Sequence, residues 1–553
     1  MTNLLSPMDL KDPYLTSQLI PYIGNKRRLI PFLHGVFQEL LSGLKQPVFL
    51  DPFAGSGAVS RLAKIMGAAV YANDWEPYTE VLNGCYIGLN AEDLSALFHD
   101  RGGIDAVLAA LNSDTGDFDP YISRYYAPAD LETADYRLER LFYTPENAVR
   151  IDRMRCRIDQ WYPAESPERT ILLAALVLQA AVRSNTSGVF KACHKGFGGH
   201  GGDALGRIMK TLRLEKPHLA AGSSPCRVYR QDAATFAAGR PAALCYLDPP
   251  YNTHQYGSNY HLLNTIVLWD RPEVDDRRGT DGRYRAKAAI RQDWKKTRSA
   301  FCSRAAAAGA MEDLLNAVDA RHIVISYNTE GIIPLEELYE MLSRRGEVEL
   351  RTRDYVTYRG GRQSISRKTS NLEFLLVCRT GSGGGASAAS LKSFMVRQRL
   401  FLLLKESFVP RRLLERFPRR GEDLILSGGL ALPTRLFYRF IRVPPFRGLE
   451  TLPLPEAEKT VRLLEEAVCR DREEEFAVLL EFLGDGLPPG DERFVRERIL
   501  PVLRKFAHRK YRESFQRGAA DLKHFLKEHP EDHTALREGL EALEALAKRR
   551  FEG

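Results

Sequence analysis

The chain contains 553 residues, of which 44% are hydrophobic and 27% are charged, values typical of a soluble protein with a large core. At about 100–200 residues per domain, this length predicts about two to four domains. The 79 basic and 71 acidic side chains leave a net charge of +8, which permits a polyanionic partner without requiring one. The longest apolar run, from Ile171 to Val182, is shorter than the roughly 20 residues of a membrane span, so we expect no membrane association.

The cysteines and the N-terminal sequence indicate the compartment. The 8 cysteines are scattered and contain no C-x-x-C pair, a usage typical of reduced thiols in a cytosolic protein. The first residues, MTNLLSPMDLKDPYL, carry acids and prolines and lack the apolar core of a signal peptide. We therefore expect a cytoplasmic protein.

Short apolar stretches alternate with helical patterns along the first two thirds of the chain. Strands separated by helices predict a mostly parallel sheet of the α/β class. The predicted strands are PVFLDPF (47–53), AAVYAND (68–74), AALCYLDPP (242–250), RHIVISYN (321–328), EVELRTRDYVTYR (347–359) and NLEFLLVCR (371–379).

Two segments interrupt this alternation and divide the chain. Residues 94–225 are mainly helical and then glycine-rich, which indicates an insertion between the halves of the α/β body, residues 14–93 and 226–379. The glycine- and serine-rich segment 380–390 predicts a flexible linker. Beyond it, apolar residues at helical spacing in 456–468, 472–483, 493–507 and 533–551 predict a separate helical domain, 391–553, to which the sequence assigns no chemistry.

A glycine turn follows the first predicted strand. The stretch DPFAGSGAVSRLA places Asp51 at the strand end, then Gly55 and Gly57, then a helical pattern. Glycines at such a turn let backbone amides approach a ligand, although a tight turn without a ligand is the alternative. Asp74 ends the next predicted strand about 20 residues later, the spacing of a carboxylate that holds an adenosine ribose. The third glycine of the dinucleotide-binding fingerprint is absent, so the turn is not a complete pyrophosphate-binding motif. S-adenosylmethionine, an adenosine ligand without a diphosphate, therefore fits better than a dinucleotide.

A proline corner follows a later strand in YLDPPYNTHQY, from Tyr246 to Tyr256. The exocyclic amine of a nucleobase is a poor nucleophile, and two hydrogen-bond acceptors draw its nitrogen toward tetrahedral geometry. Asp248 and the carbonyl of Pro249 could be those acceptors, since proline fixes the backbone, and Tyr251 could stack on the base. A sulfonium methyl is already activated, so this chemistry requires no metal. A surface turn after a strand is the alternative interpretation.

These motifs together resemble a known family. The order PYIGNKRRLIPFL, DPFAGSG, an insertion and DPPY, followed by YNTHQYGSNYHLLNTI, TRSAFC, ISYNTEGIIP and NLEFLLV, resembles the Dam-like adenine-N6 DNA methyltransferases of the α group, especially modification methylases of FokI type. The resemblance covers approximately Tyr14 to Arg379. D-P-P-Y alone also occurs in RNA methyltransferases, whereas the N-terminal G-N-K segment and the motif order are more specific.

The resemblance implies a Rossmann-like, S-adenosylmethionine-dependent sheet and roles for individual residues. The catalytic corner would be Asp248, Pro249, Pro250 and Tyr251. The cofactor would be bound by Tyr22, where relatives often have tryptophan, by Lys26 at its carboxylate region, by Asp51, Gly55 and Gly57 at the turn, by Asp74 at the ribose, and by Asp232 near the adenine. Without the resemblance, Lys26 would be one of three basic residues, with Arg27 and Arg28, at a solvated helix start.

The resemblance places target recognition in the insertion. Its segment 183–210 contains glycines, basic residues and polar residues. A loop of this composition can follow a phosphate backbone and present side chains to the edges of the nucleobases. The candidates for DNA contact are Arg183, Asn185, Thr186, Ser187, Lys191 and Lys195. The basic segment 276–298 is a candidate phosphate clamp, with a solvated loop as the alternative. Cys193, His194 and His200 have no second ligand pair at zinc spacing, so we expect no metal.

The predicted function is methyl transfer from S-adenosyl-L-methionine to N6 of adenine in double-stranded DNA at a defined sequence. The protein would protect host DNA beside a cognate restriction endonuclease, or act as a solitary modifier. Two alternatives remain open from the sequence: an RNA adenine-N6 methyltransferase and a non-catalytic DNA-binding subunit.

Overall fold

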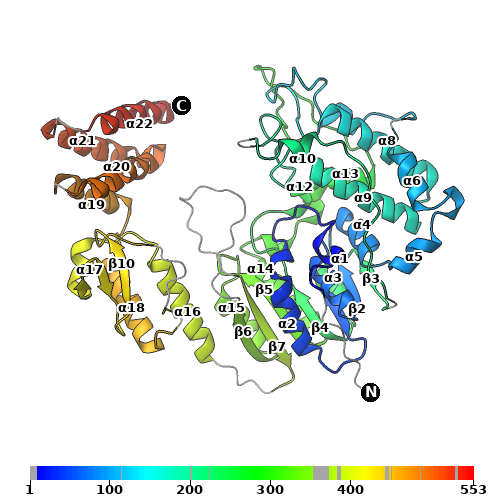
Figure 1. The fold of residues 1–553 in the computed structure, drawn as a ribbon, viewed down its shortest axis with the longest axis horizontal. Coiled ribbons are helices and arrows are strands. Elements are labelled where there is room, and N and C mark those ends of the chain that lie inside the picture. The colour runs from blue at the N-terminus through cyan, green and yellow to red at the C-terminus, as the bar shows by residue number, and fades with distance from the viewer. Residues whose placement is uncertain are drawn as a thin grey trace. The chain divides into compact units, whose positions relative to one another are not determined.

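A computed structural model of the chain describes residues 9–113, 115–199, 202–222, 224–352, 373–382, 388–441, 448–449, 451–485, 487–529 and 533–552 (Figure 1). The described residues divide into two compact units. The first contains those up to residue 352 together with residues 373–382, and the second contains those of Ser387–Gly553.

A seven-stranded sheet forms the centre of the first unit. Its order is β3-β2-β1-β4-β5-β7-β6. The strands β3, β2, β1, β4 and β5 run parallel, and β7 pairs antiparallel with both β5 and β6. This confirms the predicted α/β class with a mainly parallel sheet. The bounds are β1 Val48–Asp51, β2 Ala69–Asn73, β3 Arg227–Tyr229, β4 Ala242–Leu247, β5 Ala320–Asn328, β6 Gly346–Thr352 and β7 Glu373–Thr380.

Residues 353–359 and 371–372 of two predicted strands lie outside the described residues. The central strands are buried on both faces, which explains why their sequences are continuous apolar runs rather than alternating ones.

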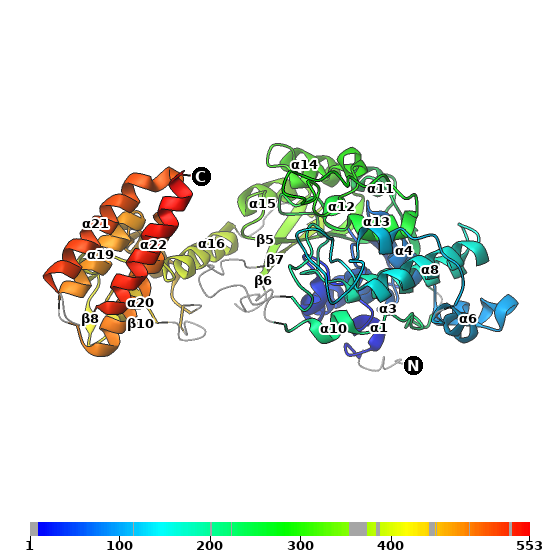
Figure 2. The same cartoon turned by 90° about the horizontal axis from the view of Figure 1, so that it is seen from above.

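Helices cover both faces of this sheet (Figure 2). One face carries α2 (Ile30–Leu40) and α3 (Ala58–Ile65), which contact each other. The opposite face carries α11 (Ala233–Ala237), α14 (Ala307–Ala317) and α15 (Leu335–Ser343). The carboxyl ends of the parallel strands therefore remain open for a ligand.

The segment inserted between β2 and β3 is largely helical. One of its two longest helices, α9 (Pro167–Arg183), is buried along nearly its whole length and packs against α4 (Pro77–Tyr86), the equally long α8 (Pro145–Trp161) and α13 (His261–Leu268). Side chains of α9 belong to the same hydrophobic cluster as those of the sheet. The other helices are α5 Ala91–Ala96, η2 His99–Arg101, α6 Ile104–Leu111, α7 Ile122–Tyr125 and α10 Leu205–Met209.

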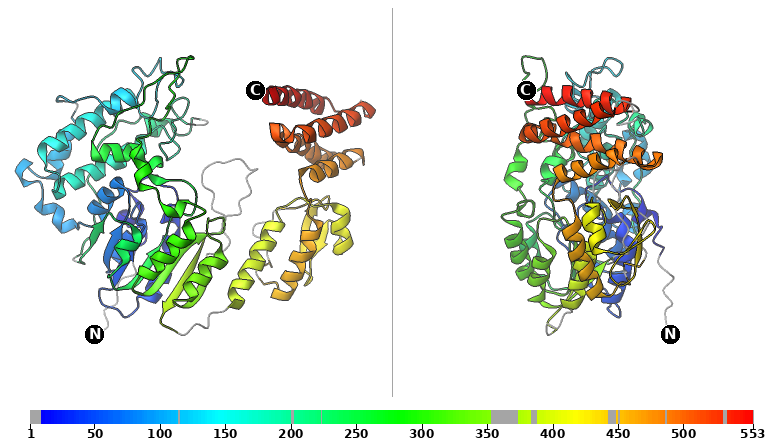
Figure 3. Two further views of the ribbon diagram at one scale, coloured as in Figure 1. Left: turned by 180° about the vertical axis from the view of Figure 1, so that it is seen from behind. Right: turned by 90° about the vertical axis from the view of Figure 1, so that its left-hand side faces the viewer.

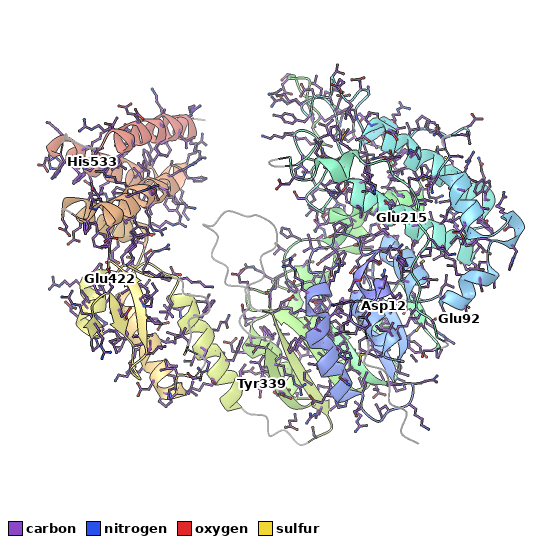
Figure 4. The ribbon with its side chains drawn as sticks, in the orientation of Figure 1. Asp12, Glu92, Glu215, Tyr339, Glu422 and His533 are labelled. Carbon is purple, nitrogen blue, oxygen red and sulfur yellow. The ribbon has the colours of Figure 1, made fainter. Side chains whose placement is uncertain are left out.

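The second unit contains helices and a small sheet. Figure 3 shows α19–α22, in orange to red, as a stack of helices that contact one another. His533, labelled in Figure 4, precedes α22 and packs on Phe525 of α21 at a ring-centroid distance of 5.3 Å. The helices are α16 Ala388–Leu403, α17 Pro410–Arg416, α18 Leu454–Ala467, α19 Arg472–Gly484, α20 Pro489–Leu503, η5 Arg504–Phe506, η6 Arg509–Tyr511, α21 Arg512–Glu528 and α22 Thr534–Glu552.

The small sheet departs from the expectation of a purely helical C-terminal domain. Its antiparallel order is β11-β10-β9-β8. The strands contain between 2 and 5 residues, too few to show a period of two in the sequence. Turns at Gly421 and at Gly428–Gly429, all with positive φ, separate three of them. The bounds are β8 Arg419–Arg420, β9 Asp423–Ile425, β10 Ala431–Arg435 and β11 Arg439–Phe440.

The predicted linker lies between the two units. The strand β7 extends to Thr380 and α16 begins at Ala388, so both ends of segment 380–390 belong to regular elements. Residues 383–387 lie outside the described residues.

Candidate active site

The carboxyl ends of β1, β2 and β4 surround one cavity of about 430 Å³. The sheet order reverses between β1 and β4, and ligands of open α/β sheets bind at such switch points. Of the residues singled out from the sequence, those that line the cavity are Tyr22, Lys26, Asp51, Gly55, Asp74, Asp232, Asp248, Pro249, Pro250 and Tyr251. Gly57 does not line it and lies behind the turn, at the start of α3.

The glycine turn joins β1 to α3 in a backbone conformation that favours glycine. Gly55 and Gly57 have φ values of +51° and +78°. A Cβ atom on Gly55 would lie 2.9 Å from Cε1 of the Tyr22 ring, and one on Gly57 would collide with the side chain of Asn83. Tyr22 therefore packs directly against the turn, as a cofactor-binding aromatic residue would.

Asp74 supports this turn from the end of β2. Its carboxylate accepts hydrogen bonds from the backbone N–H groups of Gly55 at 2.9 Å, Trp75 at 2.7 Å and Glu76 at 3.1 Å. Burial raises the pKa of Asp74, although these three N–H groups oppose the rise. The side chain thus orients the Gly55 amide as well as lining the cavity.

Asp51 is a buried acid, and one of its two carboxylate oxygens lacks a hydrogen-bond partner among the described residues. The Ser60 hydroxyl donates to Oδ2 at 2.6 Å, and Oδ1 is the oxygen without a partner in the described chain. Burial raises the pKa of Asp51 to about 7, and the neighbouring Asp248 adds to the rise. A cationic or N–H-bearing ligand in the cavity would remove this cost, because buried polar atoms are normally hydrogen-bonded.

The proline corner at the end of β4 carries an ion pair. Nζ of the buried Lys26 lies 3.1 Å from Asp248 Oδ1 and 2.6 Å from Glu373 Oε1, at the start of β7. Burial raises the pKa of Asp248 to about 6, while Lys26 lowers it. Burial alone would lower the pKa of Lys26, but Asp248 raises it well above its usual value. Lys26 is therefore a buried cation whose position beside the Asp248 carboxylate is fixed by two ion pairs.

Contacts from three residues fix the backbone and the ring of Tyr251. The Ile332 N–H donates to its carbonyl oxygen at 3.1 Å. The Tyr327 ring meets its ring edge-on at a centroid distance of 5.6 Å, and Lys26 Nζ lies 5.1 Å from the ring centroid. An aromatic ring fixed in this way beside a carboxylate is suited to stacking on a planar base.

The N-terminal segment that contains Tyr22 packs against two tyrosines that follow the proline corner in the sequence. The Tyr22 ring stacks on Tyr260 at a centroid distance of 5.2 Å and at an interplanar angle of 15°, and it contacts Tyr256 at 5.4 Å. The Ile23 N–H donates to the Tyr260 hydroxyl at 2.9 Å. Residues far apart in the sequence therefore form one wall of the cavity.

Asp232 lies at the edge of the cavity with an exposed side chain. Its Oδ1 accepts from the backbone N–H groups of Ala234 and Thr235 at 3.0 Å and 3.1 Å. It is thus the N-cap of α11 as well as a lining residue.

The six residues singled out for DNA contact fall into two groups. Ser187, Lys191 and Lys195 are exposed, whereas Arg183, Asn185 and Thr186 are buried. Asn185 Nδ2 donates to the carbonyls of Leu141 and Gly196, and Arg183 donates to the carbonyl of Arg207. In this conformation the buried three form hydrogen bonds within the protein, while Arg183 Nε and Asn185 Oδ1 have no hydrogen-bond partner among the described residues.

The basic segment 276–298 likewise contains internal ion pairs. Arg291 is buried and pairs with Asp270 at 2.7 Å and with Asp293 at 2.6 Å. The end of the segment, Thr297–Arg298, lines the cavity. This part of the clamp predicted from the sequence lies beside the catalytic corner.

Several residues of the site were not foreseen from the sequence. Glu373, which pairs with Lys26 but does not line the cavity, carried a signal, since it is an acid at the start of a strongly apolar strand. The others line the cavity and gave no signal of their own, because aromatic and polar residues in turns are common. They are Phe53, Trp75, Glu76, Gln255, Tyr256 and Phe301.

The described residues contain no group of three His, Cys, Asp or Glu side chains arranged to hold a metal ion, and His200 lies outside them. Within the same part of the chain, no helix combines the length and the apolar character needed to cross a membrane.

The same residues lie within a match to a known family. A family model described as D12 class N6 adenine-specific DNA methyltransferase matches residues 22–341, from Tyr22 in the cavity wall to a position within α15. The chain belongs to this family. It is an adenine-specific DNA methyltransferase, which confirms the resemblance carried by the G-N-K, glycine-turn and D-P-P-Y motifs.

Individual relatives agree with this assignment. The chain is 30% identical over 357 residues to the type II methyltransferase M.NlaIII of Neisseria lactamica, a match that covers 64% of this chain and 96% of that protein. It is 28% identical to the type II methyltransferase M.FokI of Planomicrobium okeanokoites, covering 64% and 51%. It is 26% identical to the modification methylase LlaI of Lactococcus lactis subsp. lactis, covering 64% and 54%. The matched region thus spans about half of the latter two proteins.

Proposed function

We propose that the protein transfers a methyl group from S-adenosyl-L-methionine to N6 of an adenine extruded from double-stranded DNA at a defined sequence. The observation that carries the proposal is the single cavity shared by the Gly55 turn, Asp51 and the Asp248 corner. Methyltransferases of this kind generally use S-adenosylmethionine. The base must leave the duplex, because a stacked and paired adenine cannot enter the cavity and place its N6 in line with the methyl donor.

The chemistry of the lining residues fits this cofactor. Two buried carboxyls with raised pKa values, Asp51 and Asp248, favour a ligand with positive charge, and the cofactor has a sulfonium and an ammonium group. Asp51 Oδ1 would accept from the ligand, and the Tyr22 ring would pack on it beside Gly55. Asp74 would hold the ribose and Asp232 would lie near the adenine. When bound, the cofactor supplies a methyl group already activated on sulfur.

The proline corner would prepare the acceptor nitrogen. The Asp248 carboxylate and the Pro249 carbonyl would each accept a hydrogen bond from the N6 amine, which makes its lone pair available. Tyr251 would stack on the base and align it. N6 would take the methyl group as the sulfonium of the donor leaves as a neutral thioether, and the Asp248 carboxylate, already hydrogen-bonded to the amine, would accept the proton that N6 loses.

For Lys26 we propose a role behind Asp248 in place of a contact to the cofactor carboxylate. The ammonium group is already paired with Asp248 and Glu373. It would keep Asp248 ionised and fix its orientation toward the base. Pro250 would maintain the corner.

The domain assignments follow from these roles. Residues 14–93 would form the cofactor-binding half, 226–379 the catalytic half and 94–225 the target-recognition insertion. Within the insertion, Ser187, Lys191 and Lys195 present exposed side chains to DNA. Segment 380–390 would link this body to the C-terminal domain, 391–553.

The biological setting that we propose is restriction–modification or solitary modification. Relatives are named type II methyltransferases and modification methylases. In the first setting, the partner would be a restriction endonuclease that recognises the same sequence.

Transfer of a tritiated methyl group to duplex DNA and to structured RNA tests the proposal. We expect label in N6-methyladenine of the duplex alone. Asp248→Ala should reduce transfer about a thousandfold or more, while most of the cofactor binding persists through Asp51 and the Gly55 turn. Label in RNA alone, or absence of transfer by the unaltered protein, would favour the RNA methyltransferase or the non-catalytic subunit.

A further inference from the structure

The second unit contains a groove of about 1130 Å³ with a strongly basic lining. It lies between α20, α22 and the two short helices η5 and η6. Its cationic side chains are Arg504, Lys505, Lys510, Arg549 and Arg550, and His508 lies among them. No aspartate or glutamate is among the lining residues.

These cations gather in one concave site without a described acid to pair with, whereas many other cations of the unit's helices form ion pairs. Elsewhere in its helices, Arg498 pairs with Glu475 at 2.8 Å and Arg493 with Glu497 at 2.8 Å. By contrast, within the part of the chain that the structure describes, none of the five groove cations forms an ion pair. All five are exposed. Arg550 reaches only a backbone carbonyl, that of Ala507 at 2.9 Å.

The walls of the groove add apolar surface between the charges. Tyr511 is 40% exposed, and Leu500 and Leu546 line the same groove. The helices α20 and α22 contact each other at Gly539, where an added Cβ atom would meet the end of the Leu500 side chain. The groove is therefore built by helix packing, whereas mobile surface lysines alone would not create a defined concave site.

We propose that this groove holds the sugar–phosphate backbone of duplex DNA. Unneutralised cations in a concave site concentrate positive potential, and a polyanion gains by releasing its counterions when it binds there. Arginine and lysine side chains donate to phosphate oxygens without reading the bases. The proposal rests on the proposed action of the chain on duplex DNA, which supplies a polyanion of this kind.

The groove then acts as a second, sequence-independent anchor for the substrate. Linking it to the methyltransferase unit on one chain raises the effective concentration of DNA at the catalytic cavity. It should lower the KM for DNA without changing kcat, because no groove residue belongs to the catalytic unit.

The test is a triple variant of the full chain, Arg504→Gln, Lys505→Gln and Arg549→Gln. Its matched control is Lys459→Gln, Arg462→Gln and Lys527→Gln, which removes three exposed cations of the same unit outside the groove. Duplex binding is measured by fluorescence anisotropy between about 50 and 200 mM salt. Thermal melting checks that both variants are folded.

We expect the groove variant to bind duplex about tenfold or more weakly and its log–log salt slope to fall by about two to three units. Its kcat at saturating DNA should equal that of the control. Affinity and slope equal to those of the control would overturn the proposal. The proposal would also be overturned if the groove variant bound vesicles of anionic lipid or polyglutamate more weakly than the control while its affinity for duplex DNA was unchanged. Failure of the proposed function appears separately, as absence of methyl transfer by the unaltered protein.

Discussion

Lys26 Nζ lies 3.1 Å from the Asp248 carboxylate, so a cation of the N-terminal segment is fixed behind the acid of the proline corner. The same nitrogen lies 2.6 Å from Glu373. The charge of Asp248 therefore depends on two residues that do not lie in the D-P-P-Y motif. Each should change the pH dependence of methyl transfer in its own direction.

Lys26→Met should shift the acid limb of the pH–kcat profile to higher pH. Burial raises the pKa of Asp248 to about 6, and Lys26 lowers it. The carboxyl accepts from the amine in its ionised form, so activity falls as the pH falls through this pKa. Loss of a cation at this distance raises a carboxyl pKa by about 1 unit or more. The measurement is kcat against pH at saturating DNA and cofactor. Lys26→Arg should retain most of the profile, and a profile for Lys26→Met like that of the exposed control Arg27→Met would refute the role.

Glu373→Gln should shift the same limb to lower pH. Glu373 raises the pKa of Asp248 by its negative charge, and its removal leaves Lys26 paired with Asp248 alone. Activity should therefore persist further into the acid range. Glu349→Gln, on the neighbouring strand β6, is the matched control. A shift upward, or none, would contradict the effect of the Glu373 charge on the pKa of Asp248.

Gly55→Ala should weaken cofactor binding, measured by calorimetric titration with S-adenosylmethionine. The new Cβ would lie 2.9 Å from the Tyr22 ring. Overpacking of this kind costs about 1–3 kcal/mol, which corresponds to about fivefold to a hundredfold in affinity. The control is Gly67→Ala, which also has a positive φ but has no atom within 4 Å of the added Cβ. Equal affinities for the two variants would contradict the packing of Tyr22 on the cofactor turn.

Cofactor affinity should decrease as the pH falls below about 7, because Asp51 attracts a cationic ligand only when it is ionised. Burial raises its pKa to about 7, and the Ser60 hydroxyl opposes the rise. Ser60→Ala should therefore shift the loss of affinity to higher pH, and Asp51→Asn should remove the pH dependence together with much of the affinity. Titration of both variants across this range is the measurement. A pH dependence that persists in Asp51→Asn would assign it to another group.

The positions of Asp51, Asp74 and Asp248 were predictable because each ends a short apolar run at a turn. Parallel strands bring their carboxyl ends together, so three separate motifs predicted one site. The pairing of Lys26 with Asp248 was not predictable, since it joins side chains far apart in the chain. The sequence also could not distinguish the buried Asn185 from the exposed Lys191, because both are polar residues in one loop.

The core shared by α9, α4 and the sheet has a consequence for redesign of the insertion to which we assign target recognition. Exchange of the whole insertion would remove the apolar face on which α4 rests and expose the methyltransferase body to solvent. The exposed positions around Ser187, Lys191 and Lys195 lie outside that core. New base preferences should therefore be sought by diversifying these surface positions while α9 is kept as the fixed frame that carries them.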